Sequence, residues 1–217
     1  MKLSEIELEA LRLMFAGSGE EFFTGGLSVC RENENYRALL AAMPGAVGRA
    51  LSELSRRGLL PLRAAVLQPT EGTRRGFWLS FPLTRLVPDL SRVSRVSYEN
   101  AAGEYRGACD YRTEGESLLL PQTEAGGFYT VLYHPVPVLP DEATDPESEL
   151  PVPPALAAAL PYFLMSELYR EDDPEAALAA RGRWESALTA AEKAAGCAES
   201  ARTGSVFECY SLREVCR

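Results

Sequence analysis

Apolar residues recur at helical spacing in the first part of the chain. They predict a helix over about residues 5–15, and Ser4 with Glu7 fits a capping box for its first N–H groups. A longer helix should end at Gly58, because six apolar residues share one face: Tyr36, Leu40, Met43, Val47, Leu51 and Leu54. Proline lacks an N–H and clashes with the preceding turn, so Pro44 predicts a kink or a junction between two helices. This N-terminal helical segment covers residues 1–58.

The pattern changes from helical to strand-like over residues 59–137. Aromatic and β-branched residues gather in short segments that Gly- and Asn-containing turns separate. The predicted strands are Phe77–Leu83, Val93–Tyr98, Tyr105–Tyr111, Ser117–Leu120 and Phe128–Tyr133. Strands at this spacing favour antiparallel meanders over β-α-β units. We therefore expect an antiparallel β-sandwich or a partly open barrel.

Helical spacing returns after a proline-rich, acidic connector at residues 138–152, which cannot pair as a central strand. Pro161 predicts either a kink or a helix start. Asp173 is a suitable N-cap for a further helix that begins at Pro174 and should end near Ala194. A C-terminal helix pair therefore covers residues 153–195. Residues 196–217 form a tail that is too apolar for a simple linker.

These patterns together predict an α+β fold. The N- and C-terminal helices would form one helical bundle, with the β region inserted between them. A chain of 217 residues that is 46% hydrophobic can bury a core of its own. No apolar run approaches the roughly 18 residues that a bilayer span needs. The acidic residues near the N-terminus are unlike a signal peptide, so we expect synthesis in the cytoplasm.

The net charge of −9 argues against broad nucleic-acid binding, but the charges are distributed unevenly. Residues 44–96 contain nine Arg and three acidic residues, whereas residues 134–169 contain six acidic residues and neither Lys nor Arg. These charges either remain solvated or dock opposite-signed regions of neighbouring copies. Arg74 and Arg75 form a candidate basic contact patch beside Phe77 and Trp78. This segment fits the tip of a β-hairpin better than a grip on a nucleic-acid strand.

Candidate chemistry is sparse. His134 is the only histidine, which excludes multi-histidine metal sites, and no nucleophile or phosphate-binding motif accompanies it. Adjacent carboxylates fall in predicted turns. The five cysteines are widely spaced and include no C-x-x-C, so we interpret them as reduced thiols. We assign no catalytic, cofactor-binding or metal-binding residue and expect no enzymatic activity; an enzyme with an unfamiliar site is an alternative.

Three stretches of sequence match a known kind of protein. They are NYRALLAAMPGAVGRA (residues 35–50), YRGACDYRTEG (105–115) with SLLL (117–120), and the region from LPYFL (160–164) to EDDPE (171–175). These stretches resemble parts of proteins encoded in the structural operons of phages and prophages of Firmicutes-type bacteria. The order of helices, β insert, helices and tail is similar to that of head-to-tail adaptor (neck) proteins, which form rings beneath the portal.

The resemblance implies a structural component of the virion that assembles in the host cytoplasm. Its partners would be the portal or other neck and tail proteins, and it would form a homo-oligomeric ring in the particle, whether or not the isolated chain is monomeric. Neither a membrane nor a specific nucleic acid is an expected partner. Phe207, Tyr210 and Leu212 are the candidate subunit-docking residues in the tail. A prophage-encoded DNA-binding or regulatory module is the alternative that the Arg-rich stretch motivates.

Overall fold

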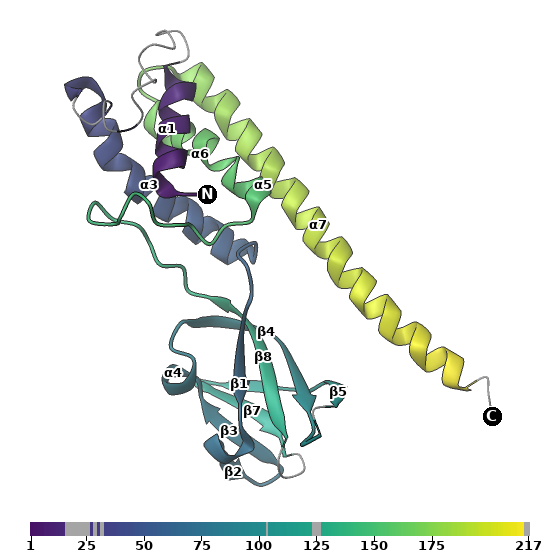
Figure 1. Cartoon of the computed structure of the whole chain (residues 1–217). Helices are drawn as coiled ribbons and strands as arrows, with labels where there is room; N and C mark the ends of the chain where they lie inside the picture. The colour runs from purple at the N-terminus through teal and green to yellow at the C-terminus, as the bar shows by residue number, and fades with distance from the viewer. Residues whose placement is uncertain (16–26, 28–29, 31–32, 103, 123–126, 215–217) are drawn as a thin grey trace. The chain divides into compact units, whose positions relative to one another are not determined.

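The chain divides into two compact units (Figure 1). A computed structural model describes the backbone of residues 1–15, 27, 30, 33–102, 104–122 and 127–214, and their side chains apart from 35, 105–106 and 197–214. Unit 1 comprises Met1–Leu59 and Val138–Arg217, and unit 2 comprises Leu60–Pro137. The β insert was predicted at residues 59–137. In the ranges that the structure describes, no helix is both long enough and apolar enough for a membrane span.

Unit 1 is helical. Its helices are α1 (Leu3–Met14), α3 (Glu34–Arg57), α5 (Pro154–Ala157), α6 (Leu160–Leu168) and α7 (Pro174–Glu214). The short helix α6 lies against α1, α3 and α7, so residues from both ends of the sequence meet around it. The largest fully buried side chains there are Trp184, Leu3, Ile6, Leu11, Met43, Leu51 and Leu54. The N-terminal and C-terminal apolar stripes therefore cover each other.

Two predicted helix features of unit 1 are corrected. The capping box at Ser4 and Glu7 is wrong: α1 begins at Leu3, and the Glu5 carboxylate accepts the Lys2 backbone N–H at 2.8 Å. Glu7 instead lies buried on the inner face of α1. Of the two outcomes predicted at Pro44, a kink or a junction, the junction between two helices is absent, because α3 runs through Pro44 as one helix. A proline removes one backbone donor, and the buried residues on either side of it hold the helix together.

The predicted starts of the C-terminal helices are confirmed. Pro161 lies in the first turn of α6, where the missing N–H has no cost. Asp173 caps α7, since its Oδ1 accepts the Ala176 N–H at 3.0 Å. The range 153–195, where a helix pair was expected, also contains one additional short helix, α5, which precedes α6.

Helix α7 extends well beyond its predicted end near Ala194. It contains 41 residues and continues to Glu214, so the expected tail at 196–217 is helical over most of its length. Such a helix is about 60 Å long at 1.5 Å per residue. Its buried stripe consists of Ala177, Ala180, Trp184 and Leu188, and no described side chain of α7 after Leu188 is buried. Alanine, the best helix former, dominates residues 190–195, and a glycine such as Gly196 costs only about 1 kcal/mol in a helix.

Unit 2 consists of two antiparallel four-stranded sheets, and its described residues form no closed barrel. The first sheet has the order β1 (Arg63–Leu67), β8 (Phe128–Pro135), β4 (Leu90–Glu99) and β5 (Tyr105–Ala108). The second has the order β2 (Thr73–Arg75), β3 (Trp78–Pro82), β7 (Ser117–Pro121) and β6 (Arg112–Glu114). A 3-10 turn (Pro69–Glu71) precedes β2, and α4 (Leu83–Leu86) follows β3. The α+β class is therefore correct.

Both sheets contribute to one core. Alternate residues of β8 are buried, and the Tyr129 ring meets Phe81 of the other sheet edge-to-face with 5.8 Å between the ring centroids. The other members of this core are Leu67, Leu79, Leu83, Val87, Val93, Val96, Leu118, Leu120, Val131 and Tyr133. This alternation of buried and exposed positions is what sheets packed on a single face require.

One carboxylate ties together the two ends of unit 2. Asp89 accepts a hydrogen bond from the Tyr133 hydroxyl at 2.9 Å and pairs with Arg63, whose Cα is the register partner of Tyr133. Burial raises the pKa of Asp89, but the hydrogen bonds from Tyr133 and Arg63 outweigh it and lower the pKa overall. Asp89 therefore helps to hold β1, the first strand of unit 2, beside β8, its last strand.

Candidate functional site

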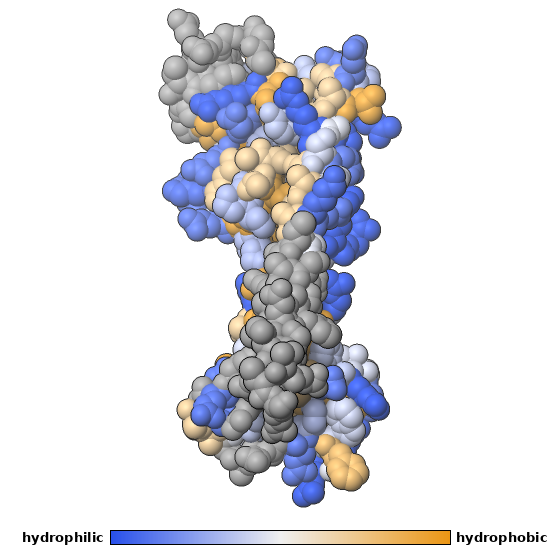
Figure 2. All heavy atoms as spheres, turned by 90° about the vertical axis from the view of Figure 1, so that its right-hand side faces the viewer, coloured by the Kyte–Doolittle hydropathy of each residue, from blue (hydrophilic) through white to orange (hydrophobic). Residues whose placement is uncertain are grey.

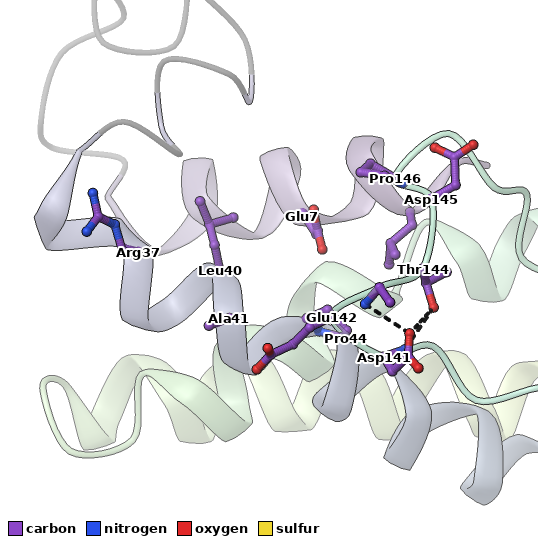
Figure 3. Close-up of a pocket in the computed structure, with 12 residues that line it drawn as sticks. Glu7, Arg37, Leu40, Ala41, Pro44, Asp141, Glu142, Thr144, Asp145 and Pro146 are labelled. Carbon is purple, nitrogen blue, oxygen red and sulfur yellow. Dashed lines mark hydrogen bonds between the residues drawn. The ribbon is translucent and has the colours of Figure 1, made fainter.

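A pocket of about 400 Å³ lies in unit 1 between α1, α3 and the connector (Figure 3). Leu3 and Glu7 of α1 form one wall, and Arg37, Leu40, Ala41 and Pro44 of α3 form another. Residues 141–146 of the connector complete it. We call it the acid-rimmed pocket, because Asp141, Glu142 and Asp145 on the connector are exposed.

Two successive turns shape the connector beside this pocket. The Asp141 carboxylate accepts hydrogen bonds from the Ala143 N–H at 3.0 Å and from the Thr144 hydroxyl at 2.8 Å. Asp145 accepts the Glu147 N–H at 2.9 Å in the same way. Aspartate favours such turns because its short side chain reaches the backbone two residues ahead. The rim is therefore a defined loop, although the sequence predicted only an extended connector here.

The connector also completes the first turn of α1. The N–H groups of Leu3 and Ser4 donate to the carbonyls of Ser148 and Pro146 at 3.1 and 2.8 Å. The first N–H groups of a helix have no partner within the helix, so the connector supplies the acceptors. Lys2 pairs with Glu147 at 2.7 Å, and this hydrogen bond lowers the pKa of the Glu147 carboxyl.

The pocket combines an apolar interior with a negative rim. Leu3 and Leu40 are buried, and Glu7, which is only 2% exposed, points from α1 towards α3 and the connector (Figure 3). Arg37 is the single cation among the lining residues, against four carboxylates. Within the described ranges, no group of three or more His, Cys, Asp or Glu side chains could hold a metal ion. The arrangement is suited to an apolar group flanked by positive charges.

A second hollow in unit 1, of about 560 Å³, has the opposite character. It lies along α3 and is lined by Arg49, Arg56 and Arg181, with Leu139 and Pro140 of the connector. Its two carboxylates are already paired: Glu167 with Arg49 at 3.2 Å, and Glu53 with Arg181 at 3.7 Å. We call this hollow the arginine groove.

The same charged side chains connect α3 to α7. Glu53, whose side chain is 12% exposed, receives Arg57 at 3.0 Å and the indole N–H of Trp184 at 3.3 Å. Arg57 reaches further, to Glu185 and Glu192 of α7 at 3.4 and 2.9 Å. This network holds the part of α7 up to Glu192 against α3. It also gives Arg49 and Arg57, two of the Arg residues of the 44–96 stretch, a role in the fold.

The candidate basic patch lies on a hairpin of unit 2, which confirms the predicted hairpin. Arg74 and Arg75 are exposed on β2, and Arg75 is the register partner of Trp78 on β3. Gly76, with a positive φ of 62°, makes the turn, and Phe77 beside it is 90% exposed. The Arg112 guanidinium stacks over the Trp78 ring at 4.9 Å. We call residues 74–78 the hairpin tip.

The candidate docking residues of the tail, Phe207, Tyr210 and Leu212, fall within the range of α7. Their side chains lie outside the described part of the chain. They belong to unit 1, whereas Arg74 and Arg75 belong to unit 2, so the two predicted sets are in different units. The acid-rimmed pocket was not predicted from the sequence, in which the acidic connector was the only signal for it.

His134 lies on β8, opposite Arg92 of β4, and its Nε2 is 3.2 Å from the Arg92 guanidinium. Burial and then the charge of Arg92 lower the pKa of the imidazole, and its buried Nδ1 has no hydrogen-bond partner among the residues that the structure describes. The group beside the imidazole is therefore a cation and not the carboxylate that orients a catalytic histidine.

Comparison with known proteins adds no assignment. The sequence matches no protein-family model and resembles no curated protein.

Proposed function

We propose that this protein is a structural component of a tailed-phage or prophage particle and acts as a head-to-tail connector (neck adaptor). It would work through protein–protein assembly, with the portal or other neck and tail proteins as partners, first in the host cytoplasm and then in the virion. The resemblance of residues 35–50, 105–120 and 160–175 to phage structural proteins supports this proposal. We also infer that α1, α3, α6 and α7 constitute one bundle into which unit 2 is inserted; the packing of α6 on the other three supports it.

The observation that carries the proposal is the length of α7 beyond its buried stripe. The helix contains 41 residues and runs to Glu214, whereas the last buried side chain among those described is Leu188, and the described residues 189–196 are not buried. Helices gain most of their stability in proteins from packing an apolar face. We infer that the part beyond Gly196 packs on another subunit, with Phe207, Tyr210 and Leu212 as the docking residues.

The net charge agrees with a connector that DNA passes through. Unit 1 contains 14 Lys and Arg against 23 Asp and Glu, whereas unit 2 contains eight of each, so the −9 charge resides in unit 1. A negative channel wall repels phosphates and lets DNA slide without binding.

Electron microscopy and light scattering of the protein mixed with the cognate portal protein test the proposal. We expect a ring of this protein on the portal. A chain truncated after Ala195 keeps the buried stripe Ala177, Ala180, Trp184 and Leu188, so it should keep the helical melting transition of the full chain and lose the ring. Failure to form any ring, with or without the portal, would overturn the proposal.

The alternative, a DNA-binding or regulatory module, has one observation in its favour: the exposed Arg74 and Arg75 beside the exposed Phe77. Basic and aromatic side chains together bind single strands by charge and stacking. A mobility-shift titration at low salt tests it. A salt-dependent shift that Arg74→Ala with Arg75→Ala abolishes would favour the alternative.

A further inference from the structure

The hairpin tip carries an unusually exposed aromatic side chain. Phe77 is 90% exposed, the highest value among the large apolar residues that the structure describes as exposed. Trp78 beside it is half-buried under Arg112, and Arg74 and Arg75 are exposed on the preceding strand. Figure 2 shows the described surface of unit 2 as mostly blue and white with isolated orange groups. Aromatic residues and arginine are the types that most often dominate binding energy at interfaces.

We propose that the hairpin tip of one copy docks into the acid-rimmed pocket of a second copy. Phe77 would enter the apolar interior between Leu3 and Leu40, and Arg74 and Arg75 would face the carboxylates of the rim. The inference rests on the proposed function only in assuming that copies of this chain meet in an assembly. The proposal names the two surfaces that form one contact between neighbouring copies: the hairpin tip and the acid-rimmed pocket.

Size and polarity match on the two sides. A cavity of about 150 Å³ lined by apolar side chains accepts benzene, so about 400 Å³ leaves room for a phenyl ring and the atoms around it. The rim places Asp141, Glu142 and Asp145 around this space, and Arg37 is the single opposing cation. Complementary charge at a rim mainly orients the partner and speeds association.

The charges also select between the two hollows of unit 1. The arginine groove has three guanidinium groups, and both of its carboxylates are paired with them. Arg74 and Arg75 would be repelled there. The three rim carboxylates, Asp141, Glu142 and Asp145, form no ion pair with Lys or Arg among the described residues. The hairpin tip is therefore complementary to this pocket and not to the groove.

A contact between two different surfaces of identical chains is head-to-tail and repeats from copy to copy. Such contacts close into rings or continue as open chains, according to the rotation between neighbours. One aromatic anchor with a charged rim is a small interface, of the kind that weak and transient contacts have. We expect it to be weak between free chains and to strengthen where a template holds many copies together.

Sedimentation velocity over a concentration series tests the proposal. The full chain should self-associate, and more strongly at low salt. Phe77→Ser should weaken this association by about 10-fold to 100-fold, the equivalent of burying one phenyl side chain. Val138→Ser is the matched control, because Val138 is 81% exposed and lies outside regular structure and outside the pocket. Equal association of the wild type and the Phe77→Ser variant would overturn the proposal.

Charge reversal separates docking between copies from an effect on folding. Arg74→Glu with Arg75→Glu should abolish association, and Glu142→Arg, at the rim carboxylate that takes no part in the connector turns, should weaken it; the three changes in one chain should restore part of it. An equimolar mixture of the Arg74→Glu/Arg75→Glu variant and the Glu142→Arg variant, each with one reversed surface, should stop at dimers. Absence of both rescue and dimers would contradict docking.

Two outcomes distinguish this contact from the proposed function. If rings on the portal persist unchanged in the Phe77→Ser variant, the proposed hairpin contact is wrong and the connector function is still supported. If Phe77-dependent self-association occurs but no ring forms on the portal, the hairpin contact is supported and the connector function is wrong. If Phe77→Ser abolishes binding of a single-stranded oligonucleotide and leaves self-association unchanged, the tip binds nucleic acid and the proposal is wrong.

Discussion

Units 1 and 2 are stabilised in different ways. In unit 1, long charged side chains take part in packing: Glu53 and Arg57 bridge α3 to α7 around Trp184. In unit 2, backbone ladders and a core built mostly from Leu and Val hold the sheets, and most of the charges stay on the surface. Surface charge that is not engaged in packing is available to partners. The difference teaches that Arg49 and Arg57 serve the fold of unit 1, whereas Arg74 and Arg75 of unit 2 lie exposed on a hairpin.

The two tryptophans allow this comparison to be measured. Trp184 is completely buried in unit 1, and Trp78 is partly exposed in unit 2. Since the chain has two tryptophans in total, replacing one by phenylalanine leaves a fluorescence probe for the other unit. Urea titrations with each probe then report the two free energies of unfolding separately.

Replacement of Trp184 by alanine should have the largest effect. Its indole packs on Phe163, with ring centroids 5.2 Å apart, and donates to Glu53. We expect a loss of about 3–5 kcal/mol in the stability of unit 1, from lost burial and a cavity. Far-UV circular dichroism should follow this loss while the fluorescence of Trp78 stays unchanged. Leu178→Ala on the same helix, at a position 73% exposed, should shift stability by less than about 0.5 kcal/mol.

Gly127→Ala should weaken unit 2 in turn. A methyl group there would overlap the Tyr98 hydroxyl and the Glu99 carbonyl, and the backbone carbonyl cannot move aside. We expect a loss of about 1–3 kcal/mol from this overpacking, measured by the Trp78 probe in a Trp184→Phe background. Gly182→Ala is the opposite case, because nothing lies within 4 Å of the added carbon. It should stabilise α7 by about 0.5–1 kcal/mol.

Glu53→Gln tests the charged network of unit 1. The amide keeps an acceptor for the Trp184 indole N–H but removes the charge that Arg57 and Arg181 face. We expect a loss of about 1–2 kcal/mol that shrinks in high salt. Glu192→Gln, at an exposed pair, should cost less than about 0.5 kcal/mol. An effect of Glu53→Gln no larger than that of Glu192→Gln would show that the network is only a surface feature.

Mild acid should produce the smallest effect, confined to unit 2. The pKa of His134 is lowered in the folded state, so the unfolded chain binds the proton more readily. Stability should therefore fall as the pH drops below about 6.5, the ordinary value for histidine. His134→Gln should remove this slope. A separate loss should begin below about pH 4, where the unfolded chain protonates Asp89 while the folded chain, with its lowered pKa, does not. This loss should persist in His134→Gln and disappear in Asp89→Asn.

The sequence predicted the elements whose burial pattern is regular. Strands β3, β4, β7 and β8 and helix α3 have apolar positions at a clear period, and each was found close to its predicted range. Strand β6 was missed, and β2 was expected only as part of the hairpin at Arg74 and Arg75, because both strands are three residues long and exposed at every position, so no alternation marks them. Strand β1 was missed because its RAAVL sequence contains little β-branched or aromatic character.

The candidate site was less accessible to sequence reasoning. Arg74 and Arg75 stand out in the sequence because they are adjacent to aromatic residues, and the hairpin there was predicted. The acid-rimmed pocket combines α1, α3 and residues 141–146, which lie up to about 140 positions apart in the chain. No local period reports such a meeting. The end of α7 was missed because residues 196–205 include two Gly, two Ser and a Thr, which are weak helix formers.

The insertion of unit 2 within unit 1 has a consequence for synthesis on the ribosome. Helices α1 and α3 emerge first, but their partner α6 follows only after the whole of unit 2 has been made. Unit 2, whose contacts are contained in one continuous stretch, can fold as soon as it emerges. Until α6 emerges, the apolar faces of α1 and α3 lack the helix that they pack against. Nascent chains stalled before residue 160 should thus contain a folded unit 2 and exposed apolar faces on α1 and α3, to which a chaperone would bind.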